Sequence, residues 1–237
     1  MIISHSKKFI MLAPWKTASQ TCHASLKRYN ESPYDRYFHF NPSLGRVVHQ
    51  HLTLSDLMAL PEGRLGYKKA AFVRNPYDRA YSGFIQIQRD FQIQPKIPIE
   101  PNWIRDLIKA QISENISKVI AAGFDFDTWI TLLSEYEIYQ PGRNTNLPFH
   151  PAHYWTHHNN YVVDFIGKVE KFDEEFFRFC ELMELDVPKI QKANISEEIS
   201  PPQSQYSRYA HRMSRRSLDR INELFARDFE LFEYQTL

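Results

Sequence analysis

The stretch that decides the fold is KFIMLAPWKTASQT, residues 8–21. Its first part, residues 8–13, is a nearly unbroken apolar run, which is typical of a strand buried on both faces. Pro14 ends this run, and from Ser19 to Tyr29 the pattern of apolar residues becomes helical. A buried strand that leads through a short loop into a helix predicts the beginning of an α/β unit.

The loop between this strand and this helix has the composition of an anion site. Lys16 supplies a full positive charge, and its small neighbours let backbone N–H groups approach an anion at the start of a helix. The hydroxyls of Thr17, Ser19 and Thr21 add hydrogen-bond donors. The Walker pattern G-x-x-x-x-G-K-[ST] is absent. Ordinary helix capping would use the same residues, so the loop alone leaves both interpretations open.

A second strand followed by a helix carries another candidate anion ligand. Residues 69–74 predict a strand, Asn75 can cap the helix that follows, and Pro76 suits its first position. Arg74 thus leaves the carboxyl end of a strand, where α/β proteins bind ligands. Ser82, two helical turns further on, can share an anion with Arg74. In the alternative interpretation, Arg74 pairs with a carboxylate and Ser82 is an incidental surface hydroxyl.

A strand followed by a helix therefore occurs at least twice, which is typical of parallel sheets with crossover helices. We predict an α/β fold, with a central parallel β-sheet flanked by helices, in a single domain over residues 1–237. A last helix with an apolar stripe is expected to close the core. The other predicted elements are a strand at 46–49, helices at 55–60 and 102–136 with a break near Gly123, and a strand at 161–166.

Composition narrows the class of protein. Hydrophobic residues make up 43% of the chain and aromatic residues 14%, which excludes wholesale disorder. The net charge of +1 argues against nucleic-acid binding through bulk positive charge. Two cysteines, Cys22 and Cys180, are too few for a disulfide framework and suit a reducing compartment. No apolar run is long enough for a membrane helix or a signal peptide, so we expect a soluble, cytoplasmic protein.

The two strand–loop–helix segments together resemble the sulfotransferase superfamily. The likeness extends from about Lys8 to Tyr234 and is closest to the branch that modifies carbohydrates, which includes the uronosyl 2-O-sulfotransferases. It implies a P-loop-like sulfotransferase fold that uses 3′-phosphoadenosine 5′-phosphosulfate (PAPS) as sulfonate donor and needs no metal. The motifs that carry the likeness, in chain order, are the loop at 14–21, VRNPYDRAYS at 73–82, DFIGKVE at 164–170 and DFELFEY at 228–234.

The resemblance implies a role for each motif. The first loop would hold the 5′-phosphosulfate end of PAPS, and Arg74 and Ser82 would hold its 3′-phosphate. Trp15 separates a proline and a lysine that are usually adjacent in the family, and Gln20 stands where a threonine is common. We expect both departures to shift donor affinity. The first-loop residues implied to bind the donor are Lys16, Thr17, Ala18, Ser19, Gln20 and Thr21.

A pair of histidines supplies the candidate base. His49 and His51, after a predicted strand, resemble the His-x-His of the 2-O-sulfotransferases, in which a histidine is the proposed base. Sulfonate transfer needs a group that takes the proton of the acceptor hydroxyl, and the ordinary histidine pKa of about 6.5 suits that task. We predict His51 as the base, His49 as a supporting or substrate-contacting residue, and Lys16 as the cation at the leaving oxygen. The alternative is two ordinary histidines at a strand end.

Further contacts are expected from two other regions. By its likeness to the family, the loop at 140–160 lies beside the acceptor cleft, with Arg143 and His153 as glycan contacts; a solvated polar loop is the alternative. Its histidines match no standard zinc spacing, so no metal is expected. Arg208 belongs to a run of arginines that either forms a solvated helix face or holds the nucleotide.

The sequence thus predicts an enzyme that moves the sulfonate of PAPS in line to an acceptor hydroxyl, with a carbohydrate as the expected acceptor. One alternative is a P-loop-type phosphotransferase, a kinase that uses ATP and Mg²⁺, although the metal ligands that it requires are not evident. The other alternative is a non-catalytic nucleotide-binding protein. Neither a nucleic-acid partner nor a transmembrane segment is expected.

Overall fold

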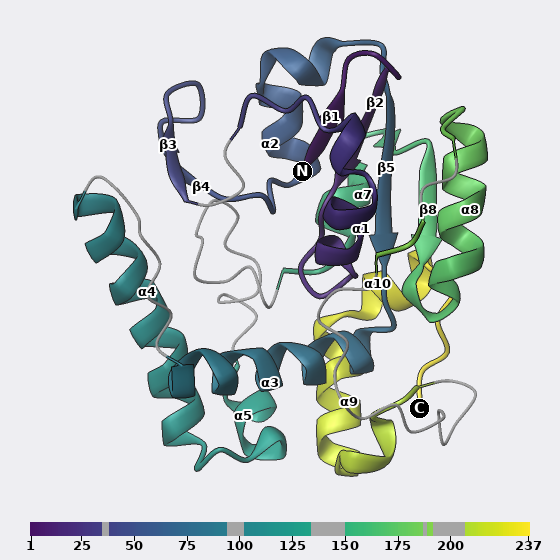
Figure 1. The fold of residues 1–237 in the computed structure, drawn as a ribbon. Coiled ribbons are helices and arrows are strands. Elements are labelled where there is room, and N and C mark those ends of the chain that lie inside the picture. Colours follow the sequence, from purple (N-terminus) through teal and green to yellow (C-terminus); the bar gives the residue numbers. More distant parts are fainter. Residues whose placement is uncertain (35–37, 94–101, 134–149, 187–188, 192–206) are drawn as a thin grey trace. The chain divides into compact units, whose positions relative to one another are not determined.

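The computed structural model describes residues 1–34, 38–93, 102–133, 150–186, 189–191 and 207–237 (Figure 1). It divides into two compact units, each with a hydrophobic core of its own. The predicted single domain over residues 1–237 stays a prediction. The first unit comprises residues 1–37, 41–74 and 152–199, and the second unit comprises residues 38–40, 75–151 and 200–237.

The first unit is built on a four-stranded sheet. The second, third and fourth strands across the sheet are parallel to one another, and the first is antiparallel to its neighbour. Because side chains alternate along a strand, Phe9 and Met11 point into one core while Ile10, also fully buried, faces the other side. The predicted α/β class is confirmed. In order across the sheet, the strands are β1 (Ile2–Ser4), β2 (Phe9–Leu12), β5 (Lys68–Val73) and β8 (Phe165–Lys168).

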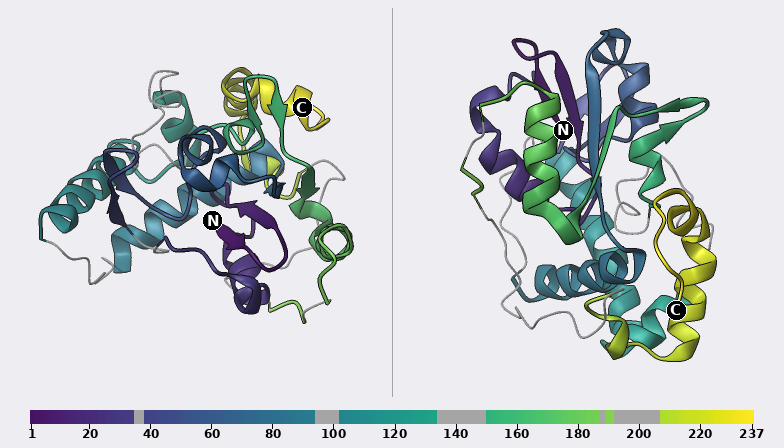
Figure 2. Two further views of the ribbon diagram at one scale, coloured as in Figure 1. Left: turned by 90° about the horizontal axis from the view of Figure 1, so that it is seen from above. Right: turned by 90° about the vertical axis from the view of Figure 1, so that its right-hand side faces the viewer.

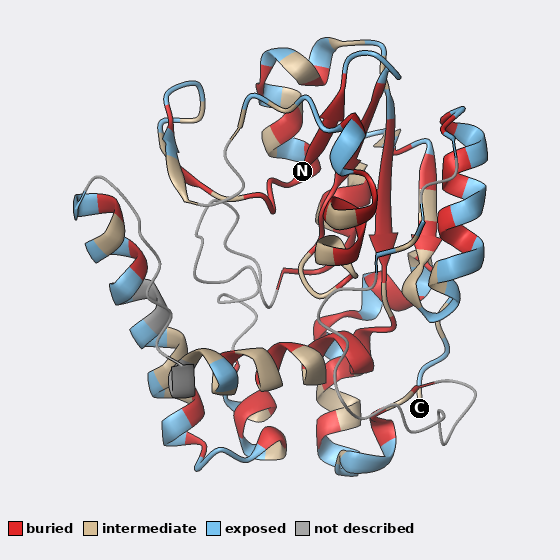
Figure 3. Ribbon diagram, viewed as in Figure 1, coloured by how far each residue is buried: buried red, intermediate tan, exposed pale blue. Residues whose placement is uncertain are grey.

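Helices lie on both sides of this sheet. α1 (Ser19–Ser25) and α8 (Phe172–Leu182) lie on the same side of the strands, as the view from above shows (Figure 2). Phe179 of α8 meets Phe9 edge to face at 5.5 Å. α7 (His153–Thr156) contacts β5, and α2 (Leu54–Ala59) packs on α7. The strands are buried along almost their whole length, whereas α8 exposes one side (Figure 3).

The described residues also form short strands and turns outside the central sheet. Two more sheets have two strands each: β3 (His39–Asn41) with β4 (Arg46–Val48), and β6 (His157–His158) with β7 (Tyr161–Val162). The strand predicted at 46–49 corresponds to β4. In the part of the chain that the structure describes, the 3₁₀ turns are Lys27–Tyr29, Pro61–Arg64, Val169–Lys171 and Ala210–Arg212.

The prediction of one strand over 161–166 is wrong, because the structure has two strands there. β7 pairs with β6, whereas β8 joins the central sheet. Between them, the carboxylate of Asp164 accepts a hydrogen bond from the backbone N–H of Lys69 at 2.7 Å. The chain therefore changes its pairing partner at Asp164, which an uninterrupted pattern of strand-forming residues does not indicate.

The second unit is helical. Its core gathers aromatic and aliphatic side chains, among them Tyr77, Phe84 and Trp129. Gly123, with φ of +62°, follows the end of α4 and marks the predicted break. None of the helices that the structure describes has the length and apolar character of a membrane span. Among the described residues, the helices of this unit are α3 (Pro76–Ile93), α4 (Asn102–Ala121), α5 (Phe126–Leu132), α9 (Arg215–Leu224) and α10 (Ala226–Leu231).

The predicted last helix is buried as expected, but it is not one continuous helix. Ile221, Phe225 and Phe229 are buried in the core of the second unit, as the apolar stripe predicts. The helix is nevertheless divided into α9 and α10 at Phe225, whose φ of −120° departs from helical geometry.

Candidate functional site

The loop after β2 has an unusual backbone. Lys16 and Ala18 have φ values of 64° and 59°, in the left-handed region, and Thr17 between them does not. Non-glycine residues in this region cost of order 1–3 kcal/mol each, and they cluster at ligand sites. A left-handed residue next to a residue of negative φ can turn successive N–H groups toward one side, as in anion-binding concavities of the backbone. The geometry therefore supports the anion-site interpretation of this loop over simple helix capping.

Thr17 closes this loop on itself. Its hydroxyl donates a hydrogen bond to the carbonyl oxygen of Pro14 at 2.8 Å, and the residue is fully buried. What Thr17 presents to an anion in this arrangement is its backbone N–H. The helix α1 begins directly after Ala18, so Ser19, Gln20 and Thr21 form a first turn whose N–H groups have no carbonyl within the helix to bond.

Lys16 lies beside an aromatic ring. Its ammonium group is 5.6 Å from the ring centre of Trp15, the residue that interrupts the usual Pro-Lys pair, and both side chains are half-buried. Trp15 thus contacts the lysine through a cation–π interaction. The departure from the family pattern therefore has a structural role next to the candidate donor loop.

A small pocket of about 10 Å³ opens beside the loop. Among its lining residues, Cys22 and His23 carry a thiol and an imidazole and were not predicted as part of the site. His23 follows Ser19 by four residues in α1, and this helical spacing is the signal that could have placed it on the same face. The remaining lining residues are Ile2, Met11, Leu12, Ala13, Thr17, Ser19 and Phe72.

The thiol of the cysteine in this pocket is expected to be unreactive. Burial raises the pKa of Cys22 to about 12 and that of Cys180 to about 11, so both remain thiols near neutral pH. We expect iodoacetamide to modify neither cysteine in the folded protein, and to modify both after denaturation in urea, as mass spectrometry would detect. Rapid modification of Cys22 in the native protein would contradict its placement in the core.

His51 lies against the beginning of the same loop. Its Nδ1 is 2.5 Å from the carbonyl oxygen of Ala13, the residue between β2 and Pro14. A carbonyl oxygen only accepts hydrogen bonds, so Nδ1 carries the proton, and in the neutral ring Nε2 carries the lone pair. The imidazole of His49 stacks on that of His51, with ring centres 4.8 Å apart. The structure therefore brings both predicted histidines to the predicted donor loop.

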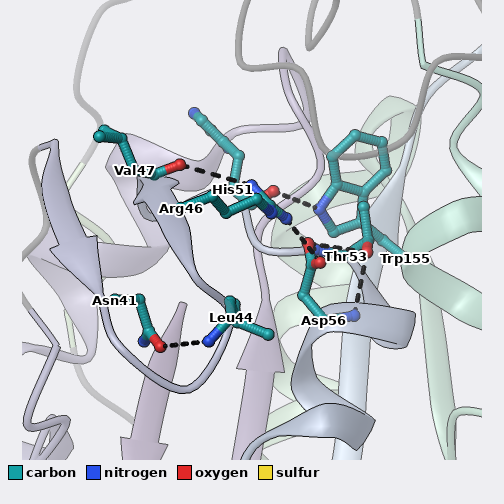
Figure 4. A network of polar contacts seen from close by, with 8 residues as sticks. All are labelled: Asn41, Leu44, Arg46, Val47, His51, Thr53, Asp56 and Trp155. Carbon is teal, nitrogen blue, oxygen red and sulfur yellow. Dashed lines mark hydrogen bonds and ion pairs between the residues drawn. The ribbon is translucent and has the colours of Figure 1, made fainter.

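Hydrogen bonds fix the segment that carries these histidines (Figure 4). The indole N–H of the fully buried Trp155, on α7, donates to the backbone carbonyl of His51 at 3.2 Å. Thr53 and Asp56 form a capping box at the start of α2. Asp56 also makes an ion pair with Arg46 of β4 at 2.6 Å. His49 and His51 lie between these two residues in the sequence. Neither Trp155 nor Arg46 was predicted, because their contacts join separate segments.

Arg74 lies at the same edge of the sheet as the loop. It follows β5, and the loop follows β2, the parallel neighbour of β5. Both therefore leave the carboxyl ends of adjacent strands, the edge at which such sheets bind ligands. Arg74 is half-buried. Its predicted partner Ser82 is a half-buried residue of α3 in the second unit.

In the second unit, Asp78 arranges the backbone next to Arg208. The carboxylate of Asp78 is buried and accepts hydrogen bonds from the Ser207 hydroxyl at 2.5 Å and from the N–H groups of Arg208 and Tyr209 at 3.1 and 3.0 Å. The ring of Tyr209 stacks on that of Tyr81 at 4.9 Å. Arg208 itself is half-buried on a backbone that is fixed to the first turn of α3.

Of the two residues predicted to contact the acceptor, the structure describes one. His153 begins α7 in the first unit, where it is buried and packs edge to face on Tyr154 at 4.8 Å. Arg143 lies outside the described residues. Within the described part of the chain, no group of three or more His, Cys, Asp or Glu residues could hold a metal ion.

Comparison with known proteins gives one match. A family model described as "Sulfotransferase family" matches residues 1–235. No curated protein and no solved structure matches the chain significantly.

Proposed function

The chain belongs to the sulfotransferase family, and from this premise we propose that it transfers the sulfonate of PAPS to a carbohydrate hydroxyl, with His51 as the base. Family membership supports sulfonate transfer in general. The donor, the acceptor class and the base belong to the proposal. The observation that carries it is the contact of His51 with Ala13, which brings a histidine to the start of a loop built for anions.

The residues of the loop fit the donor's charged end. The left-handed residues Lys16 and Ala18 shape an N–H concavity, and the Lys16 ammonium adds a full positive charge. A phosphosulfate is the kind of anion that such a loop binds. At the same sheet edge, the guanidinium of Arg74 suits a phosphate, which it can bind through two hydrogen bonds.

The chemistry assigns one task to each group. When bound, PAPS supplies the sulfonate, whose bond to the bridging oxygen breaks as the acceptor oxygen attacks the sulfur. His51 Nε2 takes the proton of the acceptor hydroxyl, which makes that oxygen a better nucleophile. Lys16 stabilises the negative charge that develops on the leaving phosphate oxygen. His49 supports the His51 ring through stacking.

The expected acceptor is a carbohydrate because the two histidines resemble the His-x-His of enzymes that modify uronic acids. In the same proposal His153 and Arg143 contact the glycan, and Arg208 and Ser82 contact the nucleotide. The phosphotransferase alternative is not favoured by the family match. A non-catalytic nucleotide-binding protein would bind the product nucleotide but would release none from PAPS with any acceptor.

Calorimetry with 3′-phosphoadenosine 5′-phosphate tests the nucleotide site. Loss of a charged hydrogen-bonding partner costs about 1.5–3 kcal/mol, so Lys16→Ala and Arg74→Ala should each weaken binding by about tenfold to a hundredfold. Lys27→Ala and Arg89→Ala are matched controls, because both side chains are exposed, and they should bind as the wild type does. Unchanged affinity in both Lys16→Ala and Arg74→Ala would remove the site assignment.

A further inference from the structure

The backbone of His51 is held independently of the donor loop. Trp155 donates to its carbonyl from α7, and two residues later Thr53 is fixed in the capping box of α2. The Arg46–Asp56 ion pair connects the strand before the histidines to the helix after them. These groups lie in separate elements around His51 (Figure 4). The backbone position of His51 is thus set by α2, α7 and β4, and its ring can restrain other groups.

The group that the His51 ring contacts is the entry to the donor loop. Ala13 lies one residue beyond the end of β2, and Pro14 after it has no N–H of its own to donate. His51 is buried, with an exposed fraction of 6%, so water competes little for the hydrogen bond to Ala13. The bond joins segments 38 residues apart in the chain.

We propose that His51 has two tasks, one for each ring nitrogen: Nε2 takes the proton of the acceptor hydroxyl, and Nδ1–H anchors the donor loop at Ala13. The first task rests on the proposed function, whereas the second does not. The loop needs an anchor because it contains two residues in the left-handed region, Lys16 and Ala18, and such conformations persist only where surrounding contacts hold them.

The anchor is compatible with proton transfer. Nδ1 carries a proton in the neutral ring and also in the imidazolium that forms when Nε2 takes a proton, so the bond to Ala13 exists in both states. It is stronger in the charged state, because hydrogen bonds from a cation are stronger than neutral ones. The Ala13 carbonyl therefore also stabilises the imidazolium, and the loop stays anchored during the reaction.

Two substitutions of His51 separate the tasks. The amide nitrogen of asparagine occupies nearly the position of histidine Nδ1, so His51→Asn keeps a donor for Ala13 but has no base. His51→Ala has neither. We expect calorimetry with 3′-phosphoadenosine 5′-phosphate to give wild-type affinity for His51→Asn and about threefold to tenfold weaker binding for His51→Ala, the worth of one neutral hydrogen bond. His158→Ala, which removes a half-buried histidine from β6, is the control and should bind normally.

Nitrogen-15 NMR of the histidine rings in the wild-type protein provides a second measurement that needs neither nucleotide nor turnover. The neutral His51 ring should carry its proton on Nδ1. A proton on Nε2, or equal affinities of the folded His51→Ala and His51→Asn variants, would overturn the anchor. If His51→Ala does not fold, the tautomer of His51 in the wild-type protein decides whether the anchor exists. A wild-type protein that binds no nucleotide but shows the Nδ1–H tautomer would refute the proposed function and leave the anchor in place.

Discussion

The His51→Gln variant should release 3′-phosphoadenosine 5′-phosphate from PAPS about 10²- to 10⁴-fold more slowly than the wild type, in the presence of an acceptor that the wild type sulfates. Glutamine fills a similar space, but its side-chain amide cannot take a proton at neutral pH. Glutamine also lacks a donor at the position of Nδ1, so the variant loses the hydrogen bond to Ala13 and is compared at saturating PAPS, where weaker donor binding does not slow turnover. The remaining loss reflects the base if the variant is folded, which thermal unfolding would verify.

The same replacement elsewhere gives the control for this prediction. His5→Gln changes an exposed histidine that precedes β2, at the opposite end of that strand from the donor loop, and its turnover should equal that of the wild type. Near-normal turnover in His51→Gln would transfer the role of base to another residue, with His49 as the first to test because it stacks on the same ring.

Arg79→Met should lower the free energy of unfolding by about 3–5 kcal/mol, because it leaves a buried carboxylate without its cation. Arg79 and Asp228 form an ion pair at 3.8 Å with both side chains only 2% exposed. The guanidinium also donates to the backbone carbonyl of His150 and lies over the ring of Phe225 at 6.0 Å. Since domains are stable by only about 5–15 kcal/mol, this is a large share of the total. Urea denaturation would measure it.

Two further variants test the cause of that loss. Arg89→Met replaces an exposed arginine of the same helix and should change stability by less than about 0.5 kcal/mol. The double variant Arg79→Met/Asp228→Leu should be more stable than Arg79→Met, because it removes the uncompensated charge. If the double variant is the less stable of the two, the loss comes from packing and not from the buried carboxylate.

Local patterns predicted the parts of the fold in which neighbours along the chain decide the structure. The apolar run before Pro14 became β2, and Pro76 begins α3 as its fixed φ favours. Gly123 ends the helix pattern because it adopts a left-handed φ at low cost. The loop at 14–21 and Arg74 were each expected to follow a strand, and they leave the carboxyl ends of the adjacent parallel strands β2 and β5.

Local sequence patterns did not predict the contacts between segments that are distant in the chain. β1 was not predicted, because its three residues form a strand only by pairing with β2. Asp164 interrupts a continuous strand pattern through a hydrogen bond to Lys69, which is 95 residues away. Asp78 lies in the first turn of α3, and its carboxylate holds residues 207–209, which are 129–131 residues away in the chain.

The sequence alone determined the α/β class, the loop with its lysine, and the histidine pair, because periodicity, prolines and short motifs act over a few residues. Only the tertiary structure decided which ring nitrogen of His51 keeps a proton. That choice depends on the Ala13 carbonyl 38 residues away, while Trp155, 104 residues away, holds the His51 backbone. A hydrogen bond depends on distances in space, and these exist only once β2, α2 and α7 have packed together.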